Sequence, residues 1–281
     1  MIQTDNTQTT HAPERDTDPV VVFKDVTIGF ESKPVLQELS FTVAPAETRV
    51  ILGPAGCGKS VLLKLANGLL CPDSGSICIF GEEITTMREV DLFTLRARIG
   101  MVFQESALFD SLNVEDNVAY RLNADGVAAE EAHTRSLEAL KFSALENAEA
   151  KFPSELSGGM RRRASIARAI VSRPNLILYD SPTGGLDPIT STTIVELLIK
   201  QRDVSHTTSL LVTHRLQDAF ALATHCFNSE RDKVEAIPKD RNGGIDPSTK
   251  FLVLNDGHVV YDGDTEGLVR TEDPWLKEYL S

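Results

Sequence analysis

The chain has 281 residues, of which 41% are hydrophobic and 25% are charged, so it can form one large domain or two small ones with an ordinary core. Its formal net charge of −13 argues against a general nucleic-acid coat, which needs a basic face, although a local basic patch is not excluded. The four cysteines form no C-x-x-C pair, so we expect neither a disulfide framework nor a zinc site. No uncharged apolar run approaches the ~20 residues of a bilayer span, so we expect no membrane helix.

The first fifty residues predict a polar lead followed by strands. Residues 1–18 are rich in Thr, Asp and Gln and poor in large apolar side chains, which favours a disordered lead-in. Alternating and β-branched residues predict strands at 20–23, 39–43 and 50–52. We expect residues 19–281 to form a single domain.

Residues 53–60 read G-x-x-x-x-G-K-S, the pattern of a phosphate-binding loop. Glycines let the backbone approach an anion closely, and successive N–H groups and the start of the next helix then face the phosphates. Lys59 would reach the β- and γ-phosphates, and the Ser60 hydroxyl would be a ligand of Mg²⁺. An apolar run precedes the motif and a helix-like run follows it, which disfavours a chance Gly-rich turn. The expected nucleotide-binding residues here are Gly53, Pro54, Ala55, Gly56, Cys57, Gly58, Lys59, Ser60 and Val61.

The middle of the chain predicts a short strand, a helix, a buried strand and then a helical block. We expect these elements at 76–80, 87–97, 99–104 and 113–172, in that order. The helical block would belong to a subdomain that spans about residues 105–172.

Two apolar runs further along each lead to a polar residue. Residues 176–180 predict a buried strand that ends at Asp180, and residues 209–214 predict another that ends at His214. Parallel strands of this kind hold ligands at their carboxyl ends, and the strand before the phosphate loop would reach the same edge. We interpret Asp180 as a carboxylate that holds Mg²⁺ directly or through water, the alternative being a cap after a buried strand. Asp187 before Pro188 predicts a helix start, with Asp as N-cap.

The last fifty residues predict a polar segment, a hairpin and an amphipathic tail. Residues 228–250 contain Pro and Gly and are expected to be a loop or insertion, to which we assign no role. Two apolar runs flank Asn-Asp-Gly at 255–257, a strong hairpin signal. The tail carries Trp275, Leu276 and Tyr279.

Residues 156–160, Leu-Ser-Gly-Gly-Met, precede an Arg/Ala-rich helix and lie about twenty residues before the Asp180 strand. Together with the phosphate loop, this pattern resembles the signature of ABC-transporter ATPases, over about residues 20–280. The resemblance implies an α/β fold: a P-loop ABC ATPase with a parallel core sheet, an antiparallel β subdomain and a helical subdomain. A Ser hydroxyl, two Gly N–H groups and a helix N-terminus make an anion site from Ser157, Gly158 and Gly159. In the family this site meets the γ-phosphate bound by the other subunit of a head-to-tail dimer.

The resemblance implies roles for four more residues. Phe30 matches the aromatic residue that stacks on adenine, although an exposed or core Phe would look the same. Gln104 matches the glutamine that senses Mg²⁺ and the γ-phosphate and contacts the membrane partner. Asp187 matches the D-loop aspartate, although its N-cap role would suffice. His214 matches the switch histidine that contacts the γ-phosphate, the alternative being a structural His at a strand end.

One residue departs from the family pattern. ABC ATPases usually carry Glu directly after the Asp at the position of Asp180, and this Glu polarises the attacking water. Here the position is Ser181, which cannot act as a carboxylate base near neutral pH. Phosphoryl transfer depends largely on positioning, so some hydrolysis could survive, with His214 or Asp187 acting through water. We therefore predict slow hydrolysis and a long-lived ATP-bound dimer, with Ser181, His214 and Asp187 as the candidate catalytic residues.

Within the family, the run at 106–120 and the Met at 160, where Gln is commoner, resemble ATPase subunits of Mla/Mce-type phospholipid transporters. That resemblance implies ATP and Mg²⁺ as cofactors and three partners: a second copy of the chain, an integral-membrane permease and an MCE-type lipid-binding protein. It also implies a position at the cytoplasmic face of the inner membrane, held by the permease. A cytoplasmic helix of the permease would enter the groove between Gln104 and the helical block.

Two other classes of function compete with a transporter subunit. A soluble ABC protein acting on nucleic acid or ribosomes is disfavoured by the single set of motifs, the lack of heptads and the acidic charge. A regulator that dimerises without useful hydrolysis is supported only by Ser181. The consecutive residues Arg161, Arg162 and Arg163 follow the signature, where the helix dipole disfavours cations, and we expect a solvated basic face there.

Overall fold

The computed structural model describes residues 18–31 and 33–281, so the predicted disordered lead lies outside the described residues except at Asp18. The strands are β1 (Val21–Phe30), β2 (Lys33–Val43), β3 (Thr48–Leu52), β4 (Ser74–Ile79), β5 (Glu82–Glu83), β6 (Ile99–Val102), β7 (Leu176–Asp180), β8 (Thr208–Val212), β9 (His225–Asn228), β10 (Lys233–Ala236), β11 (Thr249–Asn255) and β12 (His258–Asp264). The helices are α1 (Lys59–Ala66), α2 (Glu89–Arg96), α3 (Val114–Ala124), α4 (Ala129–Phe142), α5 (Gly158–Ile170), α6 (Pro188–Ser205), α7 (Leu216–Thr224), α8 (Thr265–Val269) and α9 (Pro274–Leu280).

The central sheet has six strands in the order β12-β11-β3-β8-β7-β6. Its strands from β11 to β6 run parallel, and only β12 is antiparallel, as the second strand of a hairpin. Every residue of β3, β7 and β8 is buried, as expected for strands covered on both faces. Ile51 and Asp180 both pair with Val212, so β3 and β7 end at the same level of the sheet. The predicted parallel core sheet is confirmed.

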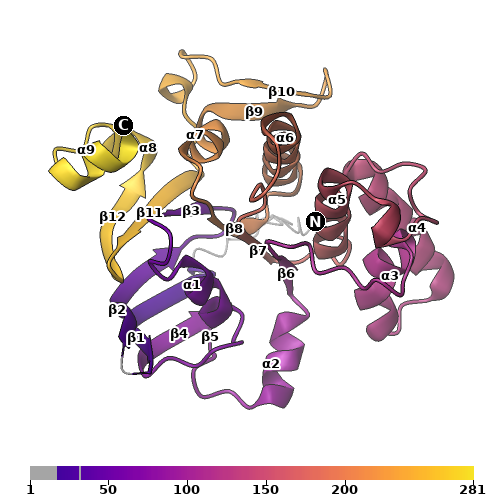
Figure 1. Cartoon of the computed structure of the whole chain (residues 1–281), viewed down its shortest axis with the longest axis horizontal. Coiled ribbons are helices and arrows are strands. Elements are labelled where there is room, and N and C mark those ends of the chain that lie inside the picture. The colour runs from indigo at the N-terminus through magenta and orange to yellow at the C-terminus, as the bar shows by residue number, and fades with distance from the viewer. Residues whose placement is uncertain (1–17, 32) are drawn as a thin grey trace, which may run out of the picture.

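The antiparallel sheet has the order β2-β1-β4-β5 and packs over α1. Strands β1 and β2 pair along their whole length, with the Phe23 and Phe41 rings stacked at 4.7 Å. The strands predicted at 20–23 and 39–43 are confirmed as β1 and β2. Each strand is longer than predicted, because buried and exposed residues continue to alternate beyond the predicted range. Figure 1 shows this sheet below the central one, with α2 to its right.

Helices α3, α4 and α5 form a block beside the central sheet (Figure 1). Their buried residues join the core cluster of the central sheet, which confirms the predicted helical segment. Asn117 on α3 is fully buried, and its amide holds the preceding loop: the oxygen accepts from the N–H of Phe109, and the nitrogen donates to the carbonyls of Phe109, Leu112 and Asn113. The loop that enters the block is therefore shaped by one side chain.

The C-terminal part differs from expectation in one segment. Residues 228–250, expected to be a loop, contain β10, which pairs antiparallel with β9, and a short 3-10 turn. The β9–β10 hairpin packs on α6 at the top of Figure 1. The hairpin predicted at Asn-Asp-Gly is confirmed: Asp256 and Gly257 both have positive φ between β11 and β12. Throughout the described ranges, no helix combines the length and the apolar character that a membrane crossing requires.

Candidate nucleotide-binding site

The phosphate loop lies between β3 and α1 at the carboxyl edge of the central sheet (Figure 1). Gly58 at the N-cap has φ +98° and places no side-chain cap on the helix, so the first N–H groups of α1 stay available to an anion. Pro54, Ala55 and Gly56 are exposed at the crown of the loop. Gly53 has a φ of +148° and lies close to the backbone of Leu254. A Cβ at this position would lie 2.4 Å from the Leu254 carbonyl oxygen. The loop geometry is that of an anion cradle.

Lys59 is 9% exposed and folds back over this loop. Its Nζ donates to the carbonyl oxygens of Gly53 at 2.8 Å and Pro54 at 2.7 Å, and lies 3.6 Å from the Cys57 sulfur. The ammonium is thus held at the centre of the loop. A phosphate entering the cradle would meet a positive charge and a ring of N–H groups.

Ser60 and Asp180 meet across the sheet. The Ser60 hydroxyl donates to Asp180 Oδ1 at 3.0 Å, although the two residues are 120 positions apart in the sequence. Both supply oxygen, the ligand that Mg²⁺ prefers. Nowhere in the described chain do three His, Cys, Asp or Glu side chains gather as a metal site, so an ion here would need the phosphates as additional ligands. The pair fits the shared Mg²⁺ role that the sequence predicted for them.

Ser181 and Gln104 lie beside Asp180. Ser181 is 7% exposed and has a positive φ of 45°. A Cβ on Gly184 would lie 3.4 Å from the Ser181 Cβ and 3.6 Å from the Gln104 Cγ, so the three residues surround one point. The predicted role of Gln104 stays a prediction, but its position near Ser181, the residue after Asp180, suits it.

Arg162 corrects one expectation. The sequence predicted a solvated basic face for the three consecutive arginines, yet Arg162 is only 4% exposed. Burial lowers the pKa of its guanidinium, and the nearby Asp180 carboxylate partly offsets this. The helix dipole disfavours a cation only close to the helix terminus. The Arg162 guanidinium reaches beyond the terminus and is stabilised by the carbonyls of Phe103 and Ser181. Of its two neighbours, Arg161 is exposed as expected and Arg163 is partly buried.

The signature residues form a separate cluster with the start of α6. Ser157 is the N-cap of α5, and its hydroxyl accepts from the N–H of Met160 at 3.2 Å. A Cβ on Gly159 would lie 2.4 Å from the Thr190 Cγ2, so this glycine is required by the close approach of the two helices. Asp187 caps α6, and hydrogen bonds from the Thr190 hydroxyl and N–H lower the pKa of its carboxylate. Its N-cap prediction is confirmed.

The predicted residues therefore divide into two half-sites. Within residues 18–31 and 33–281, no hydrogen bond joins Ser157, Gly158 or Gly159 to a residue of the phosphate loop. One half-site offers the phosphate loop with Ser60 and Asp180, and the other offers the exposed N-terminus of α5. This division is what a site completed by a second copy of the chain requires.

His214 and Phe30 are both exposed. His214 lies in a bend two residues after β8 ends, so the predicted strand was too long by two residues. Phe30 ends β1 and is 45% exposed, which makes its ring accessible to a base. Their predicted roles in binding the γ-phosphate and adenine are open to test. Behind His214, the Thr183 hydroxyl donates to Asp218 at 2.5 Å and so ties the loop after β7 to α7.

Sequence reasoning missed Tyr279 as a neighbour of the phosphate loop. Its hydroxyl accepts a hydrogen bond from the Gly53 N–H at 3.0 Å, and its ring stacks on Trp275 at 5.2 Å. Burial raises the pKa of the Tyr279 hydroxyl. The amphipathic pattern of the tail predicted a packed helix, and α9 is anchored by the buried Leu276, but no pattern in the sequence says what the helix packs against.

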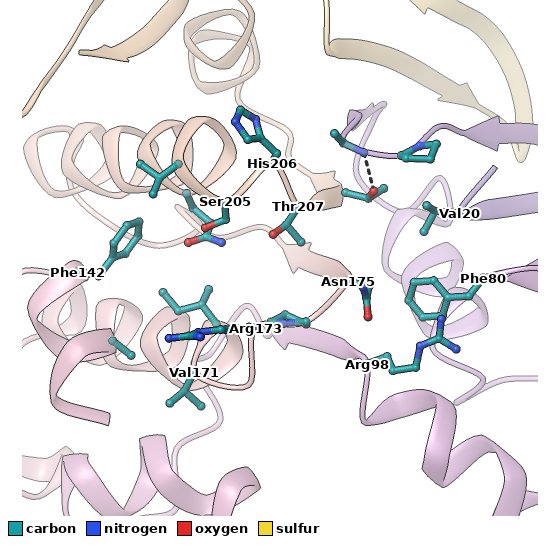
Figure 2. A pocket seen from close by; sticks show the side chains of 18 of the residues that line it. Val20, Phe80, Arg98, Phe142, Val171, Arg173, Asn175, Ser205, His206 and Thr207 are labelled. Carbon is teal, nitrogen blue, oxygen red and sulfur yellow. Dashed lines mark hydrogen bonds between the residues drawn. The ribbon is translucent and has the colours of Figure 1, made fainter. Parts of the chain in front are cut away.

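A cavity of about 950 Å³ lies at the other edge of the sheet (Figure 2). Its lining includes residues just before β3, β7 and β8, whereas the phosphate loop and Asp180 follow the carboxyl ends of these parallel strands. In Figure 2 the Arg98 guanidinium lies over the Phe80 ring, 4.0 Å from its centroid, at the side of this cavity. The cavity is thus separate from the candidate nucleotide site, which is open at the protein surface.

The sequence and the fold are both similar to known proteins. A family model described as ABC transporter matches residues 36–184. The chain is 33% identical over 262 residues to the intermembrane phospholipid transport system ATP-binding protein MlaF of Escherichia coli (strain K12), which covers 93% of this chain and 88% of that one. It is 34% identical over 258 residues to the probable ribonucleotide transport ATP-binding protein mkl of Mycobacterium bovis, covering 91% of this chain and 65% of that one.

A solved structure has the same fold. The dimeric structure of a post-hydrolysis state of the ATP-binding cassette MJ0796 bound to ADP and Pi superimposes with a TM-score of 0.72 and 28% sequence identity. The match covers 87% of this chain and 98% of that chain.

Proposed function

The chain belongs to the ABC transporter family of ATP-binding proteins, and from this premise we propose that it is the subunit that couples ATP to phospholipid movement through a membrane permease. The ATP-binding role rests on the family and on the phosphate loop. The lipid role rests on the relative named as part of a phospholipid transport system, which matches almost the whole chain. The mkl relative, named for ribonucleotide transport, makes a nucleotide the alternative cargo.

Each part of the site has one task in binding ATP. The loop from Gly53 to Gly58 holds the phosphates through its N–H groups, and Lys59 neutralises the β- and γ-phosphates. Ser60 and Asp180 hold Mg²⁺, which neutralises developing charge on the phosphates when it is bound. The exposed Phe30 ring stacks on adenine.

A second copy of the chain completes the site. At the N-terminus of α5, Ser157 is exposed and Gly158 is partly exposed, and in the described chain neither is hydrogen bonded to the phosphate loop. In a head-to-tail dimer it meets the γ-phosphate held by the partner, while His214 contacts that phosphate from the other side. The relative of known structure that is bound to ADP and Pi is a dimer, which supports this arrangement.

The permease docks on an aromatic groove beside Gln104. Phe103, Phe109 and Tyr120 are 37%, 41% and 50% exposed, and they line a cavity of about 320 Å³ between β6 and the helical block. The rings of Phe109 and Tyr120 lie 4.6 Å apart, and the Arg168 guanidinium lies over Phe109. Exposed aromatic and Arg side chains are typical of binding surfaces. Docking here would hold the chain at the cytoplasmic face of the inner membrane, and an MCE-type lipid-binding protein would be the third partner.

Hydrolysis in this subunit is slow. Ser181 stands where a carboxylate base is expected, and its hydroxyl cannot take a proton from water near neutral pH. The nearest carboxylate in sequence, Asp180, is hydrogen bonded to Ser60 and is assigned to Mg²⁺. The ATP-bound dimer therefore persists, and the slow step is hydrolysis rather than ATP binding.

Two measurements test this proposal. The first is identification of what co-purifies with the chain: a membrane permease supports a transporter, whereas RNA would support the nucleic-acid interpretation. The second is transfer of fluorescent phospholipid between vesicles by the chain with that permease, compared with Lys59→Ala as the control that cannot bind ATP. Transfer that is equal in both proteins would exclude ATP-driven lipid transport.

A regulatory protein that dimerises on ATP without useful hydrolysis is the second candidate, and Ser181 is the observation that favours it. The two candidates differ in turnover. If the chain with its permease shows no ATP hydrolysis above that of Lys59→Ala, the regulatory interpretation replaces the transport motor.

A further inference from the structure

Arg162 is a buried charge that the proposed mechanism does not use. Its guanidinium donates to four backbone carbonyls: Nη1 to Phe103 at 2.9 Å and Ser181 at 3.5 Å, and Nη2 to Gln104 and, at 3.3 Å, to Gly184. Two of these acceptors lie in the loop after β6 and two lie in the loop after β7. In the part of the chain that the structure describes, no other side chain hydrogen bonds to both loops.

The position of Arg162 on α5 connects these loops to the signature. Arg162 lies five residues after Ser157, the N-cap of the same helix, so the two residues move together when the helix moves. The loop after β6 carries Gln104, and the loop after β7 begins at Ser181, directly after Asp180. One guanidinium therefore links the segment that contacts the subunit's own nucleotide to the segment that faces the nucleotide of the partner.

The linkage is stiff because the guanidinium has no substitute partner. It is almost fully buried, and its Nε has no hydrogen-bond partner among the described residues. If either loop moved away, N–H donors of a buried charge would lose their acceptors, which is unfavourable. The two loops and α5 are thus expected to shift as one body rather than separately.

We propose that Arg162 is the positioning residue that couples the two nucleotide sites of the dimer. ATP bound at one site fixes the positions of the loops that contain Gln104 and Ser181. Because Arg162 is hydrogen bonded to both loops, the position of α5 follows theirs. The position of α5 in turn determines whether Ser157 contacts the ATP bound by the partner. The inference rests on the proposed ATP-sandwich dimer. It adds that a single buried side chain, Arg162, carries the coupling between the two ATP molecules.

The neighbouring arginine provides a matched control. Arg163 lies on the same helix, and burial lowers the pKa of its guanidinium as it does for Arg162. Arg163 donates instead to the Ala144 carbonyl at 2.5 Å, within the helical block, and no hydrogen bond among the described residues joins it to either loop. A change at Arg163 removes a similar side chain without breaking the linkage.

The test is a titration of the full chain with a fluorescent ATP analogue and Mg²⁺, with dimerisation followed by sedimentation. We expect the Hill coefficient to fall from about 1.5 in the wild type, within the limit of two set by two sites, to about 1 in Arg162→Met. Half-saturation should change less than about threefold, because Arg162 touches only backbone carbonyls. Arg163→Met should keep the wild-type Hill coefficient. Arg162→Lys should behave as Arg162→Met, since one ammonium cannot meet four carbonyls in the geometry of a guanidinium.

Several results would overturn the inference. A folded Arg162 variant with the wild-type Hill coefficient would remove the coupling role, and a lowered melting temperature with unchanged cooperativity would show a structural role only. Loss of cooperativity in Arg163→Met would show that any disturbance of α5 has the same effect. A wild type that neither binds the analogue nor dimerises would instead refute the proposed function, and the coupling with it.

Hydrogen exchange of the wild type tests the same point without any variant. Residues 103–105, 157–160 and 181–184 are expected to gain protection together, with one midpoint in ATP concentration. Midpoints that differ between the three segments would contradict the coupling even if every Arg162 variant failed to fold.

Discussion

Replacing Ser181 by Glu should convert a slow ATPase into a faster one. Ser181 is buried, directly follows Asp180 and lies near Gln104, and the proposed function assigns this position to the group that polarises the attacking water. Its backbone already carries a Cβ at φ +45°, so a longer side chain adds no new backbone strain. The guanidinium of Arg162, which donates to the Ser181 carbonyl and is influenced by the Asp180 charge, is close enough to offset part of the repulsion from Asp180.

The size of the gain follows from what a general base supplies. Positioned proton transfer contributes about 10²–10⁴-fold to a rate, and we expect the lower end because the rest of this site is arranged around a serine. A gain of about 10²-fold corresponds to a barrier lower by about 2.7 kcal/mol.

The assay is steady-state ATP hydrolysis of the chain reconstituted with its permease. Ser181→Gln is the matched control, because it has nearly the shape of Glu and cannot accept the proton. The rate of Ser181→Glu should also fall as the pH approaches about 4.3, where a Glu carboxylate is protonated. Wild type and Ser181→Gln should both stay slow at neutral pH.

Two results would refute this reasoning. Wild type that already turns over tens of ATP per second, with no gain from Ser181→Glu, would mean that another group positions the water, and His214 would be the next residue to replace. Equal rates for Ser181→Glu and Ser181→Gln would mean that side-chain size, and not the carboxylate, limits hydrolysis.

Three other substitutions test the site and its support. Lys59→Ala should abolish tight ATP binding because the loop loses its central charge, and unchanged affinity by calorimetry would reject the phosphate-loop assignment. Asn117→Ala should lower the free energy of unfolding by about 2–4 kcal/mol, because four hydrogen bonds to the loop of Phe109 are lost. Urea denaturation measures this free energy. A decrease below about 0.5 kcal/mol would contradict the prediction. Asp187→Ala should lower the melting temperature near neutral pH. The pKa of Asp187 in the folded chain lies below its unfolded value of about 3.9, so this difference should shrink as the pH falls through the folded pKa and should be absent below it.

The amino-acid sequence by itself determined the local parts of this protein. The phosphate loop, the cap at Asp187 and the Asn-Asp-Gly hairpin are each set by hydrogen bonds and backbone preferences within a few residues, so their patterns predict them directly. The apolar runs at 50–52 and 176–180 predicted buried parallel strands, because only strands covered on both faces lack polar positions. The resemblance carried by the signature then gave the arrangement of the subdomains.

The tertiary structure decided which side chains meet. Ser60 and Asp180 come together because β3 and β7 lie on either side of β8 in the same sheet, a pairing between residues 120 positions apart. Arg162 is buried because two loops close over that face of α5, and Tyr279 reaches Gly53 because α9 docks beside the phosphate loop. Local preference fixes where a helix starts, but the face that it buries depends on which distant segments offer acceptors and apolar surface to it. That is why the burial of Arg162 and its hydrogen bonds to two separate loops appeared only in the folded chain.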